Sequence, residues 1–381
     1  MKPNSRVVQL ASVDLQPREL ANIKAVLDSG WLTQGSVTRQ FEALFAERHG
    51  ASHGIATTSC TSSLHLILDC LGIKPGDEVI VPSFSWIATA NVVVQTGAIP
   101  VLVDVDQNSY AISPDAVEQA MSAKTKAVIA VHPFGFCADI DRIQEVIGSN
   151  IPIIEDAACA AGSQYKGKSA GTLGVAAAFS FHPRKSITTG EGGIILTDNQ
   201  AIAQMAKMKR NHGAEISAED RHGSVAPYLL PDFPVLGYNY RMTDIQAALG
   251  LSQLERFESL LSGRRQIAER YLNALSGRDE LSFQPVDGHS WQSFVTVLDP
   301  SSKLSRNGVM EYLYERCIST RPGYHAIHML SYYRDRFGYK PKDCPVAERL
   351  CEQSIALPLH TLLSESDVDY VLENFVEALK Q

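Results

Sequence analysis

Short apolar runs alternate with longer amphipathic segments between residues 53 and 197. This alternation is typical of a mostly parallel sheet covered by helices on both faces, because such strands carry near-continuous Val and Ile. It predicts seven strands, at His53–Thr57, Glu78–Val81, Ile99–Val103, Ala127–Val131, Ile151–Glu155, Ala177–Phe181 and Gly193–Thr197. We therefore expect an α/β fold in which a seven-stranded, mostly parallel sheet is sandwiched by helices.

Capping residues mark several helix starts. Ser113-Pro-Asp places a cap and a first-turn proline together, and Thr243-x-x-Gln246 resembles a capping box ahead of an apolar run that ends at Leu254. Farther along the chain, the pattern predicts strands at Gln292–Leu298 and Ser354–Leu357 and a helix at Glu365–Leu379. We expect a large domain at residues 1–255 and a smaller C-terminal α+β domain at residues 256–381.

The composition narrows the class of protein. The chain has 381 residues, and its 34 basic and 42 acidic residues give a net charge of −8. The chain has no run of basic residues of the kind that binds nucleic acid, so we expect no nucleic-acid partner. No stretch approaches the roughly 20 apolar residues of a membrane span, and residues 1–15 lack a signal-peptide core. Seven scattered cysteines without a Cys-x-x-Cys spacing argue against disulfides and a zinc ribbon. From the cysteines we expect a cytoplasmic protein, and from the lack of a long apolar stretch we expect no membrane partner.

The most informative pair of residues is Asp156 and Lys185. Asp156 ends the apolar run Ile151-Pro-Ile-Ile-Glu-Asp, and Lys185 follows 29 positions later (185 − 156) in a polar loop bounded by Gly190. A lysine in such a loop can form a Schiff base with an aldehyde cofactor, and a strand-end carboxylate can keep that cofactor's pyridine nitrogen protonated. The pair predicts pyridoxal phosphate chemistry.

Three further features suit a planar ring that carries a phosphate. Ser180 lies five positions before Lys185, the cluster Thr57-Thr-Ser-Cys-Thr-Ser-Ser63 precedes an apolar helical run, and Trp86 follows the second strand. They supply a hydroxyl, helix N-terminal N–H groups and an aromatic plate. Ligands of open α/β sheets collect at the carboxyl ends of strands, where these residues fall. The alternatives are a surface lysine, a core tryptophan and hydroxyls that only cap a helix.

With these residues in hand, the chain resembles, nearly end to end, the DegT/DnrJ/EryC1/StrS family of sugar aminotransferases, which have fold type I among pyridoxal phosphate enzymes. The similar segments are Ser29-Gly-Trp-Leu-Thr-Gln-Gly35, Gly76-Asp-Glu-Val-Ile-Val-Pro82, Glu155-Asp-Ala-Ala158, Tyr165-Lys-Gly-Lys168, the Lys185 loop, Gly237-Tyr-Asn-Tyr-Arg-Met-Thr-Asp-Ile-Gln-Ala-Ala248, Thr320-Arg-Pro and Phe337-Gly-Tyr-Lys-Pro341.

The resemblance implies a role for each candidate. Lys185 would hold pyridoxal 5'-phosphate and move the proton between donor and cofactor, Asp156 would pair with the pyridinium nitrogen, and Trp86 would stack on the ring. Binding of the phosphate would fall to three hydroxyl residues, Thr61, Ser62 and Ser180. Asn239 matches a position that reaches the phosphate from the neighbouring subunit, which implies a homodimer with shared active sites.

Two cysteines depart from the family pattern. The family often has Gly at the position of Cys60, and usually His or Gln at the position of Cys159, where the side chain would hydrogen-bond the cofactor's phenolic oxygen. A thiol does this weakly, so Cys159 is left out of the predicted site.

Other candidates for a site are weaker. His325-x-x-His328 could suggest a metal pair, but no carboxylate or cysteine completes it, and we expect no metal site. Arg184, Arg241 and His212 could contact a diphosphate or a donor carboxylate, and each is equally well explained as a surface charge.

The resemblance therefore implies an aminotransferase that moves an amino group from L-glutamate to a nucleotide-linked keto-deoxysugar. The resemblance implies amino sugar biosynthesis for a surface glycan, such as lipopolysaccharide, or for a natural product. One alternative is a sugar dehydratase of the same family, in which a histidine replaces the Schiff-base lysine, and Lys185 counts against it. The other is a non-catalytic regulatory protein that binds pyridoxal phosphate.

Overall fold

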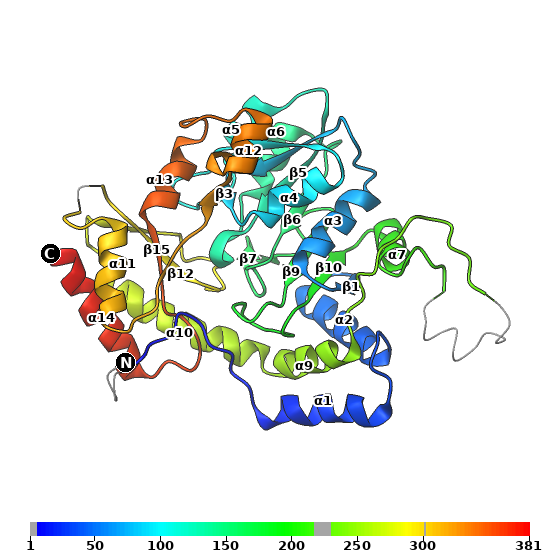
Figure 1. Ribbon diagram of the computed structural model, residues 1–381, viewed down its shortest axis with the longest axis horizontal. Coiled ribbons are helices and arrows are strands. Elements are labelled where there is room, and N and C mark those ends of the chain that lie inside the picture. Colours follow the sequence, from blue (N-terminus) through cyan, green and yellow to red (C-terminus); the bar gives the residue numbers. More distant parts are fainter. Residues whose placement is uncertain (1–5, 217–229, 301) are drawn as a thin grey trace.

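The computed structural model describes residues 6–216, 230–300 and 302–381, and it contains the expected central sheet (Figure 1). The strand order is β1-β10-β9-β6-β5-β2-β4, and β10 alone runs antiparallel to its neighbours in this sheet. The strands are β1 (His53–Thr57), β2 (Glu78–Pro82), β4 (Ile99–Val103), β5 (Thr125–Val131), β6 (Ile153–Asp156), β9 (Ala176–Ser180) and β10 (Gly193–Thr197). The seven-stranded, mostly parallel sheet is thus confirmed.

The predicted start of the strand that ends near Asp156 is wrong for a clear reason. The apolar run at Ile151 predicts a strand from that residue, but β6 begins at Ile153. Pro152 has no N–H to give to a ladder, and only its carbonyl is used, as the acceptor for Val128 N. The strand also extends one residue farther than predicted, to Asp156, whose backbone pairs with β5 and β9.

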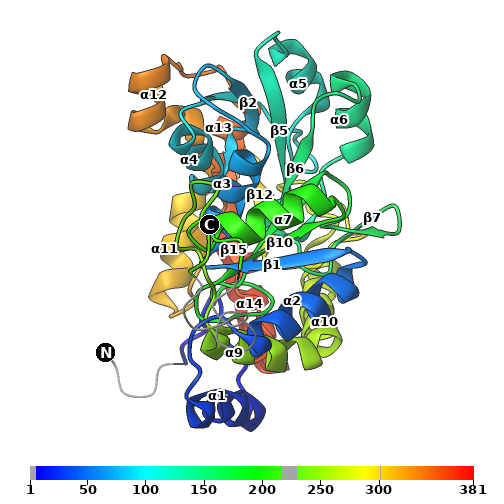
Figure 2. The ribbon, with the colours of Figure 1, turned by 90° about the vertical axis from the view of Figure 1, so that its right-hand side faces the viewer.

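Helices cover both faces of this sheet. Along β5, Ile129 packs with one group of helices and Val128 packs with the other, as the two-residue period of a strand requires. Figure 2 shows α4 on one side of the sheet and α6 on the other. The first face carries α3 (Cys60–Cys70), α4 (Ala88–Gln95) and α7 (Gln200–Lys209); the second carries α2 (Ser36–His49), α5 (Pro114–Ala120), α6 (Ile140–Ile147) and α9 (Asp244–Glu255). Helix α1 (Pro17–Ser29) lies against α9.

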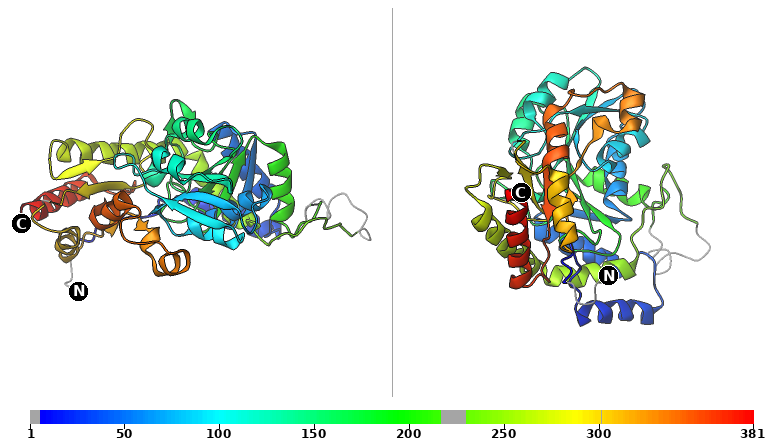
Figure 3. Two further views of the ribbon diagram at one scale, coloured as in Figure 1. Left: turned by 90° about the horizontal axis from the view of Figure 1, so that it is seen from above. Right: turned by 60° about the vertical axis from the view of Figure 1, so that its left-hand side comes forward.

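The C-terminal part of the chain forms a second, antiparallel sheet with its own core. Its strands, in order, are β11 (Leu281–Phe283), β12 (Phe294–Leu298), β15 (Ser354–Leu357) and β13 (Arg321–Pro322), and the packed helices are α10 (Phe257–Leu275), α11 (Arg306–Glu315) and α14 (Glu365–Lys380). Figure 3 shows α14, in red, at one end of the molecule. The α+β character matches the prediction. The domain boundary at residue 255 stays a prediction, and α9 and α10 flank it.

Short elements connect the two sheets. Strand β14 (His325–Ala326) pairs with β3 (Phe84–Ser85), so a C-terminal segment lies beside the residues that follow β2. The other short elements are β7 (Gln164–Tyr165), β8 (Lys168–Ser169), η1 (Pro133–Gly135), η2 (Ile327–Met329), α12 (Ser331–Phe337) and α13 (Pro345–Gln353). Among the described helices, none is long and apolar enough to cross a membrane.

Candidate active site

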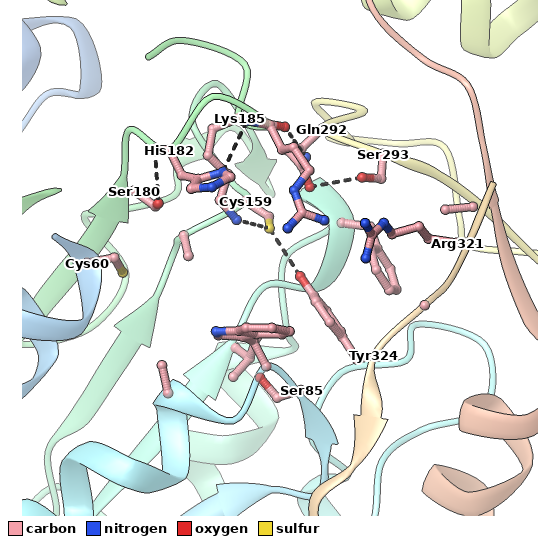
Figure 4. Close-up of a pocket in the computed structure, with 18 of the residues that line it drawn as sticks. Cys60, Ser85, Cys159, Ser180, His182, Lys185, Gln292, Ser293, Arg321 and Tyr324 are labelled. Carbon is pink, nitrogen blue, oxygen red and sulfur yellow. Dashed lines mark hydrogen bonds between the residues drawn. The ribbon is translucent and has the colours of Figure 1, made fainter. Parts of the chain in front are cut away.

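A cavity of about 780 Å³ opens between the carboxyl ends of the parallel strands and the small sheet. Five predicted site residues line it: Thr61, Trp86, Asp156, Ser180 and Lys185. The opposite wall comes from the C-terminal part of the chain and includes Gln292, Ser293, Arg321 and Tyr324 (Figure 4). Residues that were predicted to be neighbours because they follow strand ends thus line one cavity, although they are up to 124 positions apart in the sequence (185 − 61).

Asp156 is a buried carboxylate at the floor of this cavity. Its Oδ2 accepts a hydrogen bond from Thr89 Oγ1 at 2.7 Å, and its Oδ1 accepts one from Ala158 N at 3.2 Å. Burial raises the pKa of Asp156 above its ordinary value, although these two donors and the charge of Lys185 act in the other direction. A cationic partner in the cavity would offset this cost of burial.

Lys185 directs its amine to the centre of the site. Lys185 Nζ lies 3.0 Å from Cys159 Sγ, and Tyr324 Oη lies 3.1 Å from the same sulfur (Figure 4). Burial by itself would lower the pKa of Lys185, but nearby Cys159, Cys60 and Asp156 favour the charged form, and the net effect is a raised pKa. Cys159, which the sequence argument left out, is thus the residue in contact with the predicted Schiff-base amine.

Two side chains hold the loop that carries Lys185. The buried guanidinium of Arg264, on α10, donates to the carbonyls of Gln292 and Leu359 at 3.0 and 3.2 Å and to the Lys185 carbonyl at 3.4 Å. Gln292 Nε2 donates to the Arg184 carbonyl at 2.6 Å. The loop backbone is therefore fixed from the small-sheet side, and this leaves the amine free to point into the cavity.

The N-terminus of α3 faces the cavity through Ser59, Cys60 and Thr61. Ser59 caps this helix, since its hydroxyl accepts from Ser62 N at 3.1 Å, while Ser62 Oγ accepts in return from Ser59 N at 3.0 Å. The amides of Cys60 and Thr61 precede Ser63 N, the amide that donates to the Ser59 carbonyl to begin the helical ladder, and such first-turn amides bind anions. Ser62 does not line the cavity; its hydroxyl serves the cap, and its role toward a phosphate stays a prediction.

Trp86 is not a core tryptophan. Its side chain is 56% exposed and lines the cavity, with its ring centroid 6.0 Å from that of His325. His328, the other member of the suspected metal pair, is fully buried, where Nδ1 meets Ser83 Oγ at 2.6 Å and Nε2 meets Glu348 Oε1 at 3.0 Å. His328 therefore joins β2 to α13, and His325 lies at the cavity.

Some predicted contacts lie outside the cavity of their own chain. Asn239, Arg241 and His212 are absent from its lining, while Arg184 is present. Asn239 is exposed and forms an isolated bridge with Asn211, and Arg241 Nη1 donates to Asn211 Oδ1 at 2.9 Å. The predicted reach of Asn239 into a neighbouring subunit remains a prediction.

Sequence reasoning missed Thr89 and Tyr324. Thr89 lies on α4, three positions after Trp86, where a threonine facing the strand-end carboxylate could have been suggested by helical spacing. Tyr324 is 165 positions from Cys159, in the turn between β13 and β14, and its place depends on the pairing of β14 with β3. No local pattern marks that contact.

Comparison with known proteins identifies the family. The model of the DegT/DnrJ/EryC1/StrS aminotransferase family matches residues 13–376. The chain belongs to this family. Three similar structures are the aminotransferase TlmJ from Streptoalloteichus hindustanus (33% identity, TM-score 0.88, 98% of this chain and 100% of that one), Spr1654 from Streptococcus pneumoniae in its PMP form (30%, 0.91, 98% and 98%), and GDP-4-keto-6-deoxymannose-3-dehydratase, ColD, with bound GDP-perosamine (27%, 0.86, 97% and 100%).

The site fits the cofactor of this family. The protein is a pyridoxal phosphate-dependent sugar aminotransferase of fold type I. Its cavity offers an amine on Lys185, a buried carboxylate on Asp156 whose raised pKa favours a cationic partner, and helix N-terminal amides at Thr61. These three groups match the aldehyde, the pyridine nitrogen and the phosphate of pyridoxal 5'-phosphate.

Proposed function

We propose that this enzyme transfers the amino group of L-glutamate to the keto carbon of a nucleotide-linked deoxysugar. The observation that carries the proposal is the extent of the cavity, which continues from Asp156 and Lys185 to Arg184, Arg306 and Arg321. Figure 4 places Arg321 across the cavity from Ser180, on the side away from the predicted phosphate site. The cavity therefore has cationic groups where a second, anionic ligand would lie.

The residues of the site divide the work of the reaction. Pyridoxal phosphate, when bound, supplies an electrophilic carbon and an electron sink. The Lys185 amine would hold the cofactor and, once free, would take up and return the proton of the substrate carbon. The Asp156 carboxylate, oriented by Thr89, would balance the positive charge of the pyridine nitrogen, and Trp86, which lines the cavity, would pack on the ring.

The arginines suit a donor with two carboxylates and an acceptor with a diphosphate. Within the described part of the chain, no carboxylate forms an ion pair with Arg184 or Arg321, so their charges are available to a ligand. Glutamate and a nucleotide-linked sugar would occupy the site in turn, as a ping-pong reaction requires. The net charge of −8 does not attract an anion from a distance, so these local groups would provide the binding.

We further propose a cytoplasmic homodimer in which Asn239 of each chain completes the phosphate site of the other. All seven cysteines are free thiols, which suits a reducing compartment. The exposed position of Asn239, outside its own cavity, is consistent with contact to a second chain. Biosynthesis of an amino sugar for a surface glycan, such as lipopolysaccharide, or for a natural product is the pathway class we propose.

Two alternative functions make different predictions. A dehydratase of the same family, the activity that the name of the similar ColD gives, would use a histidine where this chain has Lys185. A non-catalytic regulatory protein would bind the cofactor but would not convert it with glutamate. The absorbance change of the cofactor on addition of glutamate separates the non-catalytic protein from an aminotransferase, and Lys185 counts against the dehydratase.

The test of the substrate class compares matched acceptors. We expect that nucleotide-linked ketosugars accept the amine from the glutamate-treated enzyme, while the same free ketosugars react poorly, because the remote nucleotide helps to position the reacting carbon. Arg321→Ala should raise KM for the nucleotide-linked sugar and leave the value for the free sugar unchanged. Equal rates with both forms, or reaction with simple keto acids alone, would refute the nucleotide-sugar assignment.

A further inference from the structure

Lys185 and Cys159 place an amine next to a nucleophilic sulfur, and both side chains line the open cavity of the candidate active site. Lys185 Nζ and Cys159 Sγ are 3.0 Å apart, and both residues line the cavity. Among the described residues, no other lysine nitrogen hydrogen-bonds a cysteine sulfur. The proposed aminotransfer reaction uses the Lys185 amine and does not use the Cys159 sulfur.

The sulfur has two hydrogen-bond neighbours: the Lys185 amine donates to it, and the Tyr324 hydroxyl exchanges a hydrogen bond with it. The raised pKa of Lys185 keeps its amine protonated, and burial, together with the adjacent Cys159, raises the pKa of Tyr324 well above its usual value, so that it stays a phenol. Tyr324 is held in place by its ring, which stacks on Phe134 at 4.4 Å between centroids. The sulfur therefore lies against a cationic hydrogen-bond donor, the kind of surroundings in which cysteines react with oxidants.

Cys60 provides an internal contrast in the same cavity. Its sulfur lies 3.4 Å from the Ala178 carbonyl and 4.0 Å from Asp156 Oδ1, both of which are acceptors. Burial and the charge of Asp156 raise the pKa of Cys60 well above its ordinary value, so this residue stays a thiol. The two cysteines that line this cavity should therefore differ in reactivity, because Cys159 faces the Lys185 ammonium and Cys60 faces acceptors.

We propose that a hydroperoxide oxidises Cys159 and that the product is captured by Lys185 as a reversible sulfur–nitrogen bond. In the first step the sulfur attacks the peroxide, the O–O bond breaks, and the thiol becomes a sulfenic acid with release of water, or of an alcohol from an organic peroxide. In the second step the Lys185 ammonium gives one proton to solvent, the neutral amine attacks the sulfur, and the hydroxyl leaves as water with a second proton from nitrogen. The sulfur has lost two electrons, the peroxide has gained them, and the protein has lost two hydrogen atoms.

This bond would compete with cofactor attachment for the same nitrogen. When Lys185 Nζ is bonded to the aldehyde carbon of pyridoxal phosphate, the amine cannot attack the sulfur. When Lys185 is captured by Cys159, it cannot hold the cofactor. A thiol such as dithiothreitol would cleave the sulfur–nitrogen bond and restore both side chains. The cross-link therefore marks protein whose Schiff-base lysine is free, and it protects the sulfur from irreversible oxidation.

The test uses the full-length protein, stripped of cofactor or saturated with pyridoxal phosphate, and treated with equimolar hydrogen peroxide. We expect the stripped protein to become lighter by two hydrogen atoms, with a cross-linked peptide pair that contains Cys159 and Lys185. Dithiothreitol should restore both the mass and the ability to bind pyridoxal phosphate. Saturation with the cofactor should prevent the cross-link. None of these readouts involves a sugar or glutamate, so the outcome is independent of the proposed substrates.

Matched variants separate the proposed chemistry from general thiol oxidation. Cys60→Ser should form the cross-link as the wild type does, and Cys159→Ser should not form it. Tyr324→Phe should form it several-fold more slowly because the sulfur loses a hydrogen-bond partner. Addition of oxygen atoms to Cys159 with Lys185 unmodified would overturn the proposal. So would oxidation of Cys60 ahead of Cys159, or an equal rate of cross-linking in the cofactor-saturated protein.

Discussion

The carboxyl group of Asp156 has a raised pKa in the folded protein because burial disfavours its charge. A folded-state pKa above the unfolded value means that the folded protein binds the proton more tightly, so stability is highest below the unfolded pKa and falls as pH rises through the folded one. At neutral pH the carboxylate therefore destabilises the protein without its cofactor. The same charge is what a pyridinium nitrogen needs, so function and stability oppose each other at this residue.

Asp156→Asn tests this opposition. We expect the variant without cofactor to be at least as heat-stable as the wild type at pH 7 and to lose less stability as pH rises, because it has no charge to bury. Its transamination rate should fall by orders of magnitude, since the pyridine nitrogen loses its charge partner. Thermal melts across pH and single-turnover kinetics measure the two effects. Near-normal turnover would remove Asp156 from the reaction.

Thr89 is a positioning residue for that carboxylate. Thr89→Val removes the 2.7 Å hydrogen bond to Asp156 Oδ2 and keeps the shape of the side chain. A hydrogen bond to a charged group is worth about 1.5–3 kcal/mol, so we expect turnover to fall about tenfold to a hundredfold while the cofactor stays bound. Thr89→Ser should keep most of the activity because it restores the donor. If the pH profile of turnover is the same in Thr89→Val and the wild type, Thr89 does not act through Asp156.

At the scale of elements, strand β6 is anchored by the residue before Asp156. Glu155 is fully buried, and its oxygens accept from His132 Nε2 at 2.9 Å and from the amides of Gly171, Leu173 and Gly174 at 2.7 to 2.8 Å. Burial would raise the pKa of Glu155, but these donors outweigh it and the pKa is lowered. The network holds the end of β6, and with it the backbone of Asp156.

Glu155→Gln should weaken this anchor. Because the folded pKa of Glu155 is lowered, its contribution to stability is present above the unfolded value near 4.3 and is lost as pH falls through the folded pKa. We expect the variant to be less stable at pH 7 by about 3 kcal/mol, as for a broken buried pair, and to lose less stability than the wild type on acidification. Urea unfolding at neutral and acidic pH measures both. An unchanged unfolding midpoint at pH 7 would show that the network does not support the strand.

The elements of the large sheet could be predicted from sequence, while their connections to the small sheet could not. Buried parallel strands carry a continuous apolar signal, and Asp156 and Lys185 followed from strand ends. Strands β13 and β14 contain two residues each, too few to show a period, yet β14 places Tyr324 at the cavity. Ser62 shows another limit, because a hydroxyl that caps a helix and one that binds a phosphate look the same in sequence.

At the scale of the whole molecule, the proposal requires two chains for one complete site. Asn239 lies outside the cavity of its own chain, so the proposed phosphate contact must come from a partner. Mixing a Lys185→Ala chain with an Asn239→Ala chain should therefore produce heterodimers in which one of the two sites is intact. If the chains mix at random, about a quarter of the sites recover full cofactor retention and activity. No recovery after verified exchange of chains, or a monomer in solution, would contradict the shared site.

The most direct test of the account is to find which lysine carries the cofactor. Purified full-length protein, saturated with pyridoxal phosphate, is reduced with borohydride, digested and mapped by mass spectrometry. The account predicts a single pyridoxyl adduct on Lys185, the lysine that lies in the cavity with Asp156, and its loss in Lys185→Ala. An adduct on another lysine in the native protein, or an unchanged yield in Lys185→Ala, would contradict the central claim.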